Sequence, residues 1–306
     1  MERRNFIKNT LLATGALAFS SAGENLFAGN APVASPPFPA ATRFKKSVMW
    51  GTVGLEGSVL DKCKAIKEAG YNGIEPNSHM DRNEVSAAMK STGLIASSVC
   101  CSTHWENPLS HPDASVRRKG IDGMIVALED AKAYGTDAVL LVPGVVNETV
   151  RYDECWNRSV ESIRQLLPVA EKLNVKICIE NVWNNFLLSP MEACNYVDQF
   201  NSDYVRFYFD CGNILVYGWP EQWIRILGKR IGRIHIKEFS KQEADKQGRW
   251  AGFNVKLTEG DVDWKSVMDE ARKSYNGEWL TTEQDNSQTL ADLKDLSKRF
   301  DKILAM

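Results

Sequence analysis

Eight short runs of β-forming residues alternate with amphipathic helical stretches from residue 46 to the end of the chain. The runs lie at residues 47–53, 73–77, 95–101, 137–144, 175–181, 205–213, 233–239 and 278–283. Three of the intervening stretches end at Gly70, Gly93 and Gly135, and a glycine just past a helix takes the left-handed conformation without a Cβ clash. This rhythm predicts an α/β fold, a (β/α)8 TIM barrel in a single domain, rather than a doubly wound open sheet.

The composition and charge of the chain exclude several classes of protein. At 306 residues, with 43% hydrophobic and 25% charged, the chain can bury one large core. Its net charge of -2 provides no basic excess to displace counterions from a phosphate backbone, so we expect no nucleic-acid partner. No GxGxxG or Walker sequence follows the first run, which removes the usual nucleotide-binding folds. The net charge and the missing motifs therefore favour a protein that acts on a small molecule.

The first thirty residues differ in kind from the rest. Arg3 and Arg4 precede Phe6 and a short apolar stretch, LLATGALAF, and this order resembles a twin-arginine export signal. The apolar stretch is shorter than the roughly 20 residues that span a bilayer, so we expect cleavage and no stable membrane anchor. We predict a signal peptide at 1–30, a linker at 31–45 and a catalytic barrel at 46–306. The protein would then be periplasmic or otherwise exported, and cytoplasmic if this leader is not functional.

Seven cysteines, an odd number without CxxC spacing, occur in a chain too large to need disulfides for stability. We predict that they are mostly buried thiols, although free thiols conflict with export to an oxidising compartment. Alternation along a strand places Cys178 on the same side as Glu180, and Tyr208 on the same side as Asp210. We assign that side to the lumen of the barrel.

Four of the runs in the second half each end in one side chain that can bind a metal: Glu180, Asp210, His235 and Glu283. Functional groups of a TIM barrel gather where the strands end, so consecutive strands would bring these four to one arc of the barrel mouth. Three carboxylates and an imidazole suit Mn²⁺, Mg²⁺ or Co²⁺ better than a structural Zn²⁺. Taken singly, each acid could cap a helix and the histidine could be a core residue. The coincidence of all four predicts a catalytic metal site.

The order Glu, Asp, His, Glu resembles the sugar phosphate isomerase/epimerase superfamily of xylose isomerase-like TIM barrels, which includes ketose and pentulose 3-epimerases and hydroxypyruvate isomerase. Supporting segments are IEN at 179–181, FDCGN at 209–213, RIHIKEF at 233–239, EGDVDW at 259–264 and the stretch that begins at Pro108. The resemblance implies a divalent metal cofactor held by the four residues, Mn²⁺ first, with Mg²⁺ or Co²⁺ as alternatives. It further implies a sugar isomerase or epimerase, with Glu180 and Glu283 as the acid/base pair around a cis-enediolate, and a homo-oligomer.

Six further residues are candidates for contact with a sugar substrate: Trp50, Glu75, His104, Asn184, Asn213 and Lys237. Trp50 and Glu75 end the first two expected strands, and His104 follows the third. An indole can stack on a sugar, although packing explains each of the three residues equally well. Lys237 shares a strand face with His235 and serves either as a substrate-facing cation or as the charge partner of an acid. Many free-sugar epimerases of the superfamily have His at the position of Asn213 and Arg at that of Lys241. These departures indicate a substrate other than a plain ketohexose.

The segment 240–261 is long and polar, and it contains Arg249, Trp250 and Lys256. Long loops at the mouth of such a barrel are often lids. We predict a lid here, with a disordered insertion as the alternative.

Other functions remain open at this stage. A base beside a 3-keto group can also expel a β-linked aglycone, so the same site would serve a lyase acting on 3-keto glycosides. A DNA-repair endonuclease of this fold needs a histidine-rich trinuclear zinc site, whereas the chain has four histidines and an acidic balance. A non-catalytic sugar-binding barrel has no use for two glutamates around one metal. Export would favour a free sugar or a keto-glycoside over a phosphorylated sugar.

Overall fold

A computed structural model describes residues 43–284 and 287–306, so the predicted signal peptide and most of the predicted linker lie outside the described residues. Within this range the strands are β1 (Lys45–Met49), β2 (Gly73–Glu75), β3 (Ile95–Ala96), β4 (Val99–Cys100), β5 (Ala138–Leu141), β6 (Lys176–Glu180), β7 (Val205–Asp210), β8 (Ile231–Ile236) and β9 (Trp279–Thr282). The α-helices are α1 (Val59–Glu68), α2 (Arg82–Thr92), α3 (Ala114–Tyr134), α4 (Tyr152–Leu173), α5 (Pro190–Asp198), α6 (Cys211–Ile214), α7 (Pro220–Leu227), α8 (Lys241–Gln247), α9 (Trp264–Ser274) and α10 (Leu290–Leu304). Three 3-10 segments are η1 (Trp50–Thr52), η2 (Gly228–Arg230) and η3 (Arg249–Phe253).

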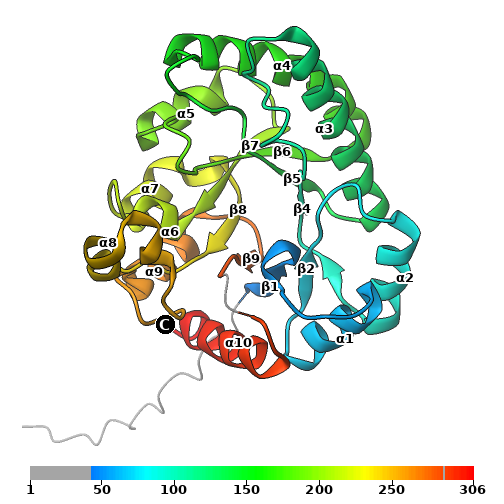
Figure 1. The fold of residues 1–306 in the computed structure, drawn as a ribbon, viewed down its shortest axis with the longest axis vertical. Helices are drawn as coiled ribbons and strands as arrows, with labels where there is room; N and C mark the ends of the chain where they lie inside the picture. Colours follow the sequence, from blue (N-terminus) through cyan, green and yellow to red (C-terminus); the bar gives the residue numbers. More distant parts are fainter. Residues whose placement is uncertain (1–42, 285–286) are drawn as a thin grey trace, which may run out of the picture. The chain divides into compact units, whose positions relative to one another are not determined.

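The nine strands form one parallel sheet that curls into a nearly closed barrel, and the helices surround it (Figure 1). Their order is β3-β2-β1-β9-β8-β7-β6-β5-β4. The two edge strands, β3 and β4, are separated in the chain by Ser97 and Ser98 alone. They are the two ends of the single run expected at 95–101, which explains why eight expected runs give nine strands. The predicted TIM barrel is confirmed.

Side chains fill the break between β3 and β4. The carbonyl of Ser97 accepts hydrogen bonds from Arg233 Nε at 2.7 Å and from Thr136 Oγ1 at 2.9 Å. Arg233 lies on β8, is buried, and also pairs with Asp137, just before β5, at 2.5 Å. Its guanidinium therefore reaches across the barrel and satisfies a backbone group that a regular ladder would have paired.

The lumen contains a small cluster of inward-facing side chains, Cys100, Ala138, Leu140, Cys178 and Tyr208, with Met49 packed against it. Cys178 and Tyr208 thus lie on the inner side, as the strand alternation predicts. A larger core lies between the strands and the helices. All seven cysteines are buried and free, which confirms that they are thiols rather than disulfides.

The helix ends follow local sequence signals. Asp81 caps α2 by accepting hydrogen bonds from two backbone amides, and the helix ends at Gly93 with φ 67°. Helix α3 ends at Gly135 with φ 77°, and Gly70, which follows α1, has φ 92°. The three glycines therefore occupy the left-handed positions expected of them.

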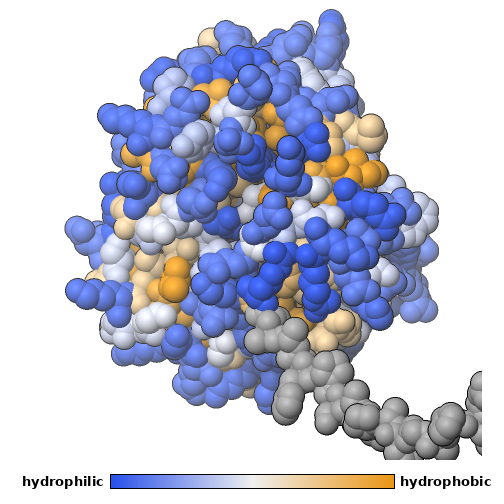
Figure 2. All heavy atoms as spheres, turned by 180° about the vertical axis from the view of Figure 1, so that it is seen from behind, coloured by the Kyte–Doolittle hydropathy of each residue, from blue (hydrophilic) through white to orange (hydrophobic). Residues whose placement is uncertain are grey.

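The outer surface is dominated by polar side chains. Figure 2 shows the face turned away from the viewer in Figure 1, where hydrophilic residues surround separate hydrophobic patches. Among the helices of residues 43–284 and 287–306, none combines the length and the hydropathy that crossing a bilayer requires.

Candidate active site

The strand register brings the four expected metal ligands together. Asp210, the last residue of β7, pairs with His235 on β8, and Glu180 is the last residue of β6. Glu283 follows β9, and its amide donates to the carbonyl of Ile236 at 3.2 Å. One ligand atom from each of the four side chains lies within 4.8 Å of the other three. The predicted convergence at the strand ends is therefore observed.

The imidazole of His235 directs one nitrogen at the three carboxylates. Its Nδ1 lies 2.9 Å from Glu180 Oε1, 3.1 Å from Glu283 Oε2 and 3.9 Å from Asp210 Oδ2. Burial by itself would lower the pKa of His235, but the acidic groups around the ring raise it well above its ordinary value. Because Nδ1 faces these three carboxylates, it is the nitrogen that a cation at the centre of the cluster would meet, in place of the proton.

The other nitrogen of His235 is held from behind by a carboxylate. Nε2 lies 3.1 Å from Glu75 Oε1, and the second oxygen of Glu75 accepts hydrogen bonds from the hydroxyls of Tyr208 and Ser98. The Tyr208 ring lies 4.3 Å from the imidazole ring. A histidine that binds a metal commonly donates its other ring N–H to such a carboxylate, which fixes the tautomer and the ring orientation.

Glu75 was expected among the substrate contacts, and the structure places it elsewhere. Its side chain is fully buried, and its two oxygens are occupied by His235, Tyr208 and Ser98. Glu75 is the last residue of the three-residue strand β2, which is buried throughout. Its side chain therefore meets the histidine instead of solvent.

The acidic cluster fits a divalent cation. In the described part of the chain, Asp210 Oδ2 and Glu283 Oε2 are buried oxygens without a hydrogen-bond partner. Burial raises the pKa of Asp210 well above its usual range, and burial followed by the charge of Glu283 raises that of Glu180 to about 7. Buried like charges this close repel each other unless a cation compensates them. Three carboxylates and one imidazole nitrogen are a suitable donor set for Mn²⁺, Mg²⁺ or Co²⁺.

Lys237 has one of the two roles considered for it, that of a charge partner. Its Nζ lies 3.1 Å from Glu283 Oε1 and 4.6 Å from the centre of the Phe253 ring. Burial alone would raise the pKa of Glu283, but the Lys237 ammonium and His235 outweigh this effect and hold that pKa below its usual value. Lys237 is thus the charge partner of Glu283, and it also lines the cavity described below.

The loops after β6 and β7 hold each other through hydrogen bonds between side chains and main-chain groups. The Asn181 side chain accepts from the Asp210 amide and donates to the Asp210 carbonyl, both at 2.9 Å. Asp210 Oδ1 accepts from the Asn213 amide at 2.6 Å, and Asn213 Nδ2 donates to the Asn181 carbonyl at 2.9 Å. Trp183 Nε1 donates to the Asn213 carbonyl at 2.9 Å. These contacts join the IEN and FDCGN segments.

A cavity of about 200 Å³ opens onto Glu180 and Glu283. Its lining consists of Met49, Cys100, His104, Trp105, Leu140, Glu180, Val182, Trp183, Asn213, Lys237, Trp250 and Glu283. Three of the expected substrate contacts, His104, Asn213 and Lys237, are therefore in position, and their contact with a substrate stays a prediction.

The other expected contacts lie outside this lining. Trp50 is in η1, packs against the core and has the Lys62 ammonium 5.6 Å over its ring. Asn184 is buried and donates to the carbonyl of Gly144 at 2.7 Å, so it holds the loop after β6 to the loop after β5. Both follow a strand end, which is why the sequence suggested them.

Two tryptophans of the cavity, Trp183 and Trp250, were not singled out as substrate contacts from the sequence. Their ring centres are 4.7 Å apart. Trp250 belongs to the segment 240–261, which forms α8 and η3, so this segment is structured rather than a disordered insertion. Gln284, next to Glu283, donates to the carbonyls of Phe253 and Val255 and thereby attaches this segment to the site. Whether the segment opens and closes stays a prediction.

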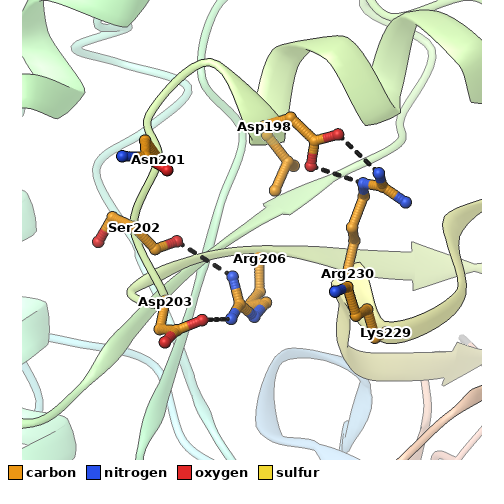
Figure 3. Close-up of a pocket in the computed structure, with 8 residues that line it drawn as sticks. Asp198, Asn201, Ser202, Asp203, Arg206, Lys229 and Arg230 are labelled. Atoms are coloured by element: carbon orange, nitrogen blue, oxygen red, sulfur yellow. Dashed lines mark hydrogen bonds and ion pairs between the residues drawn. The ribbon is translucent and has the colours of Figure 1, made fainter.

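A larger cavity of about 430 Å³ lies near the loops that lead into β7 and β8 (Figure 3). Its cationic side chains include Arg230, which is bonded to both oxygens of Asp198 at 2.6 Å, and Arg206, which pairs with Asp203. These loops precede the strands, whereas TIM-barrel active sites lie where the strands end. We therefore place the active site at the smaller cavity.

A parallel barrel with an acidic, metal-suited cluster at its carboxyl-terminal strand ends defines the class of protein. Residues 63–302 match the xylose isomerase-like TIM barrel family, and the chain belongs to this family.

Curated relatives and solved structures agree with this family. L-ribulose-5-phosphate 3-epimerase UlaE of Escherichia coli O1:K1 / APEC is 26% identical over 220 residues, which cover 69% of this chain and 74% of the relative. UlaE of Salmonella paratyphi C (strain RKS4594) is 26% identical over 238 residues, which cover 72% and 80% of the two chains.

Among solved structures, apo 3-keto-D-glucoside 4-epimerase YcjR from E. coli superposes with a TM-score of 0.72 at 16% identity, covering 85% of this chain and 98% of its own. L-ribulose 3-epimerase superposes with a TM-score of 0.71 at 15% identity, covering 85% and 94%. At such identities the superpositions show a shared fold.

Proposed function

We propose that the protein is a divalent-metal-dependent sugar epimerase that moves a proton on the carbon beside a carbonyl group through a cis-enediolate. The observation that carries this proposal is the cluster of Glu180, Asp210, His235 and Glu283, whose ligand atoms lie within 4.8 Å of one another and include two buried oxygens without a hydrogen-bond partner. The UlaE relatives are named as 3-epimerases, which supports the same reaction class here.

The four residues have distinct tasks in this reaction. When bound, the cation supplies positive charge that stabilises the oxygens of the substrate as the proton leaves carbon. Glu283, kept ionised by Lys237, accepts a proton from carbon, and Glu180 delivers one to the opposite face. Asp210 and His235 complete the ligand set, and Glu75 keeps His235 in the required orientation.

The proposal also covers the identity of the cation, the assembly, the localisation and the type of reaction. We favour Mn²⁺ as the cation and a homo-oligomer as the assembly, both because of the superfamily resemblance. We also propose export of the mature barrel, because of the paired arginines near the N-terminus. The compared proteins named above are epimerases, which favours epimerisation over the lyase reaction.

Solvent isotope exchange tests the proposal directly. Protein loaded with Mn²⁺ is incubated in D₂O with free ketoses, ketose phosphates and keto-glycosides, and deuterium uptake is followed by NMR. We expect exchange at the carbon beside the carbonyl, together with the epimer, and loss of both after treatment with a chelator. If no compound exchanges while Mn²⁺ binds, the protein is a binding barrel and the proposal is wrong.

A further inference from the structure

The lining of the active-site cavity changes in character between its buried and its exposed parts. The buried part carries the polar groups Glu180, Asn213 and His104. The exposed part is marked by two tryptophans, Trp105 at 55% and Trp250 at 70% exposure. Ligand sites combine a few placed polar groups with aromatic walls, and exposed aromatic side chains beside such a site indicate a further contact surface.

The described lining of the cavity offers no unpaired positive charge for a phosphate group. Among the described residues of its lining, Lys237 and His104 are the side chains that could be cationic. Lys237 is paired with Glu283, and burial lowers the pKa of His104 to about 4, which leaves that ring neutral at pH 7. A divalent ion together with Lys237 would balance the three carboxylates. A phosphate, which proteins bind through charge-assisted hydrogen bonds, would find no excess cation here.

Arg249, the neighbour of Trp250 in the chain, is exposed and makes its contacts outside the described lining of this cavity. The guanidinium of Arg249 lies 4.2 Å over the Trp183 ring and 4.9 Å over the Tyr217 ring, and it donates to the Tyr217 hydroxyl. It lines a different cavity, together with Lys241 at the start of α8. Arg249 therefore packs against Trp183 and Tyr217, and it does not belong to the described lining of the active-site cavity.

The exposed tryptophans come from two separate loops. Trp105 follows β4 and stands at right angles to the His104 ring, with their centres 5.4 Å apart. Trp250 lies on η3 against Trp183. Indole faces attract the apolar faces of rings, whereas the outer hydroxyls of a short ketose would need hydrogen-bond partners there.

We infer that the substrate is an uncharged keto-glycoside, whose reacting sugar lies at Glu180 and Glu283 and whose second ring contacts Trp105 and Trp250. This inference rests on the proposed epimerase function and specifies its substrate class. It separates the chain from its curated relatives, whose names specify a phosphorylated pentulose.

Four compounds test the inference: the phenyl and methyl glycosides of 3-keto-D-glucose, L-ribulose and L-ribulose 5-phosphate. Deuterium exchange by the Mn²⁺-loaded full chain is measured as kcat/KM for each. We expect the phenyl glycoside to exceed the methyl glycoside about tenfold and the phosphate to be the poorest of the four. Trp105→Ala and Trp250→Ala should each bring the phenyl-to-methyl ratio closer to one. Trp219→Ala, at a tryptophan that is 59% exposed and outside the cavity lining, is the matched control and should keep the ratio.

The outcomes separate this inference from the function on which it rests. Best turnover of L-ribulose 5-phosphate, or equal turnover of the two glycosides, would overturn the inference and leave an epimerase. Absence of exchange with all four compounds would overturn the proposed function as well. Because both tryptophans are exposed, the two alanine variants should fold, and an unchanged unfolding midpoint verifies this.

Discussion

The two sides of the barrel contribute to the site in different ways. Each of the strands β6 to β9 ends in or leads directly to one member of the acidic cluster, and among the described residues β1 to β5 supply none of its four members. The β1–β5 side instead contributes residues that hold His235 in place and residues that line the cavity. Glu75 and Ser98 stand behind His235, while Met49, His104 and Leu140 line the cavity. The β6–β9 side thus supplies the four members of the acidic cluster, and the β1–β5 side helps to orient His235.

The largest effect is expected on the β6–β9 side. Glu180→Gln and Glu283→Gln each remove an acid/base group and a charged donor, so deuterium exchange should fall by at least about 10³-fold. Stopped assays with Mn²⁺-loaded protein measure this loss. Glu278→Gln, at an exposed glutamate paired with Lys45, is the matched control and should keep full activity. Full activity in both site variants would remove the acid/base assignment.

A smaller effect is expected from the supporting side. Glu75→Gln keeps the size of the side chain but removes the charge behind His235, so affinity for Mn²⁺ should fall about 10- to 100-fold. Isothermal titration calorimetry with Mn²⁺ alone measures it.

A second readout distinguishes orientation from general damage to the fold. In the Mg²⁺-loaded protein, ¹⁵N shifts of His235 should show a hydrogen on Nε2, and Glu75→Gln should broaden or shift this signal. Unchanged Mn²⁺ affinity together with an unchanged signal would show that the two sides act independently.

The contact that joins the two sides should affect stability. Asp137→Asn removes the partner of the buried Arg233, and because Asp137 is 46% exposed we expect a loss of only about 1 kcal/mol in the free energy of unfolding. Arg233, followed by Lys176, lowers the pKa of Asp137 to about 2 despite the opposing effect of burial. The contribution is therefore complete above about pH 4 and is lost as the pH falls towards 2. Urea titrations at pH 7 and pH 2.5 should show a clearly smaller difference between wild type and variant at the lower pH. An equal difference at both values would contradict the ion pair.

An effect of similar size on stability, and a smaller one for the milder variant, concerns the helix ends before β5 and β6. Helix α3 ends at Gly135 and α4 at Asn174, both in the left-handed conformation. A Cβ at Gly135 would meet no atom within 4 Å, so Gly135→Ala should cost backbone strain alone, about 1 kcal/mol. Gly135→Asn should cost less, because asparagine tolerates this conformation, as Asn174 shows. Thermal unfolding of both variants measures their relative stability. Equal unfolding midpoints would be evidence against the expected order.

The sequence by itself determined the barrel and the four residues of the acidic cluster. Strand runs, helix-ending glycines and one metal-binding side chain at each of four strand ends are local patterns, and the parallel register of consecutive strands converts them into proximity. For the same reason Cys178 and Tyr208 could be assigned to the lumen from alternation alone.

Only the tertiary structure decided which of the remaining candidates meet the site. Glu75 and Trp50 both follow strand ends, yet one lies behind His235 and the other packs against the core. Trp250 reaches the cavity from a segment far along the chain. The physical reason is that strand length and loop path set the depth and direction of each side chain, and these depend on packing between distant segments rather than on the neighbouring residues.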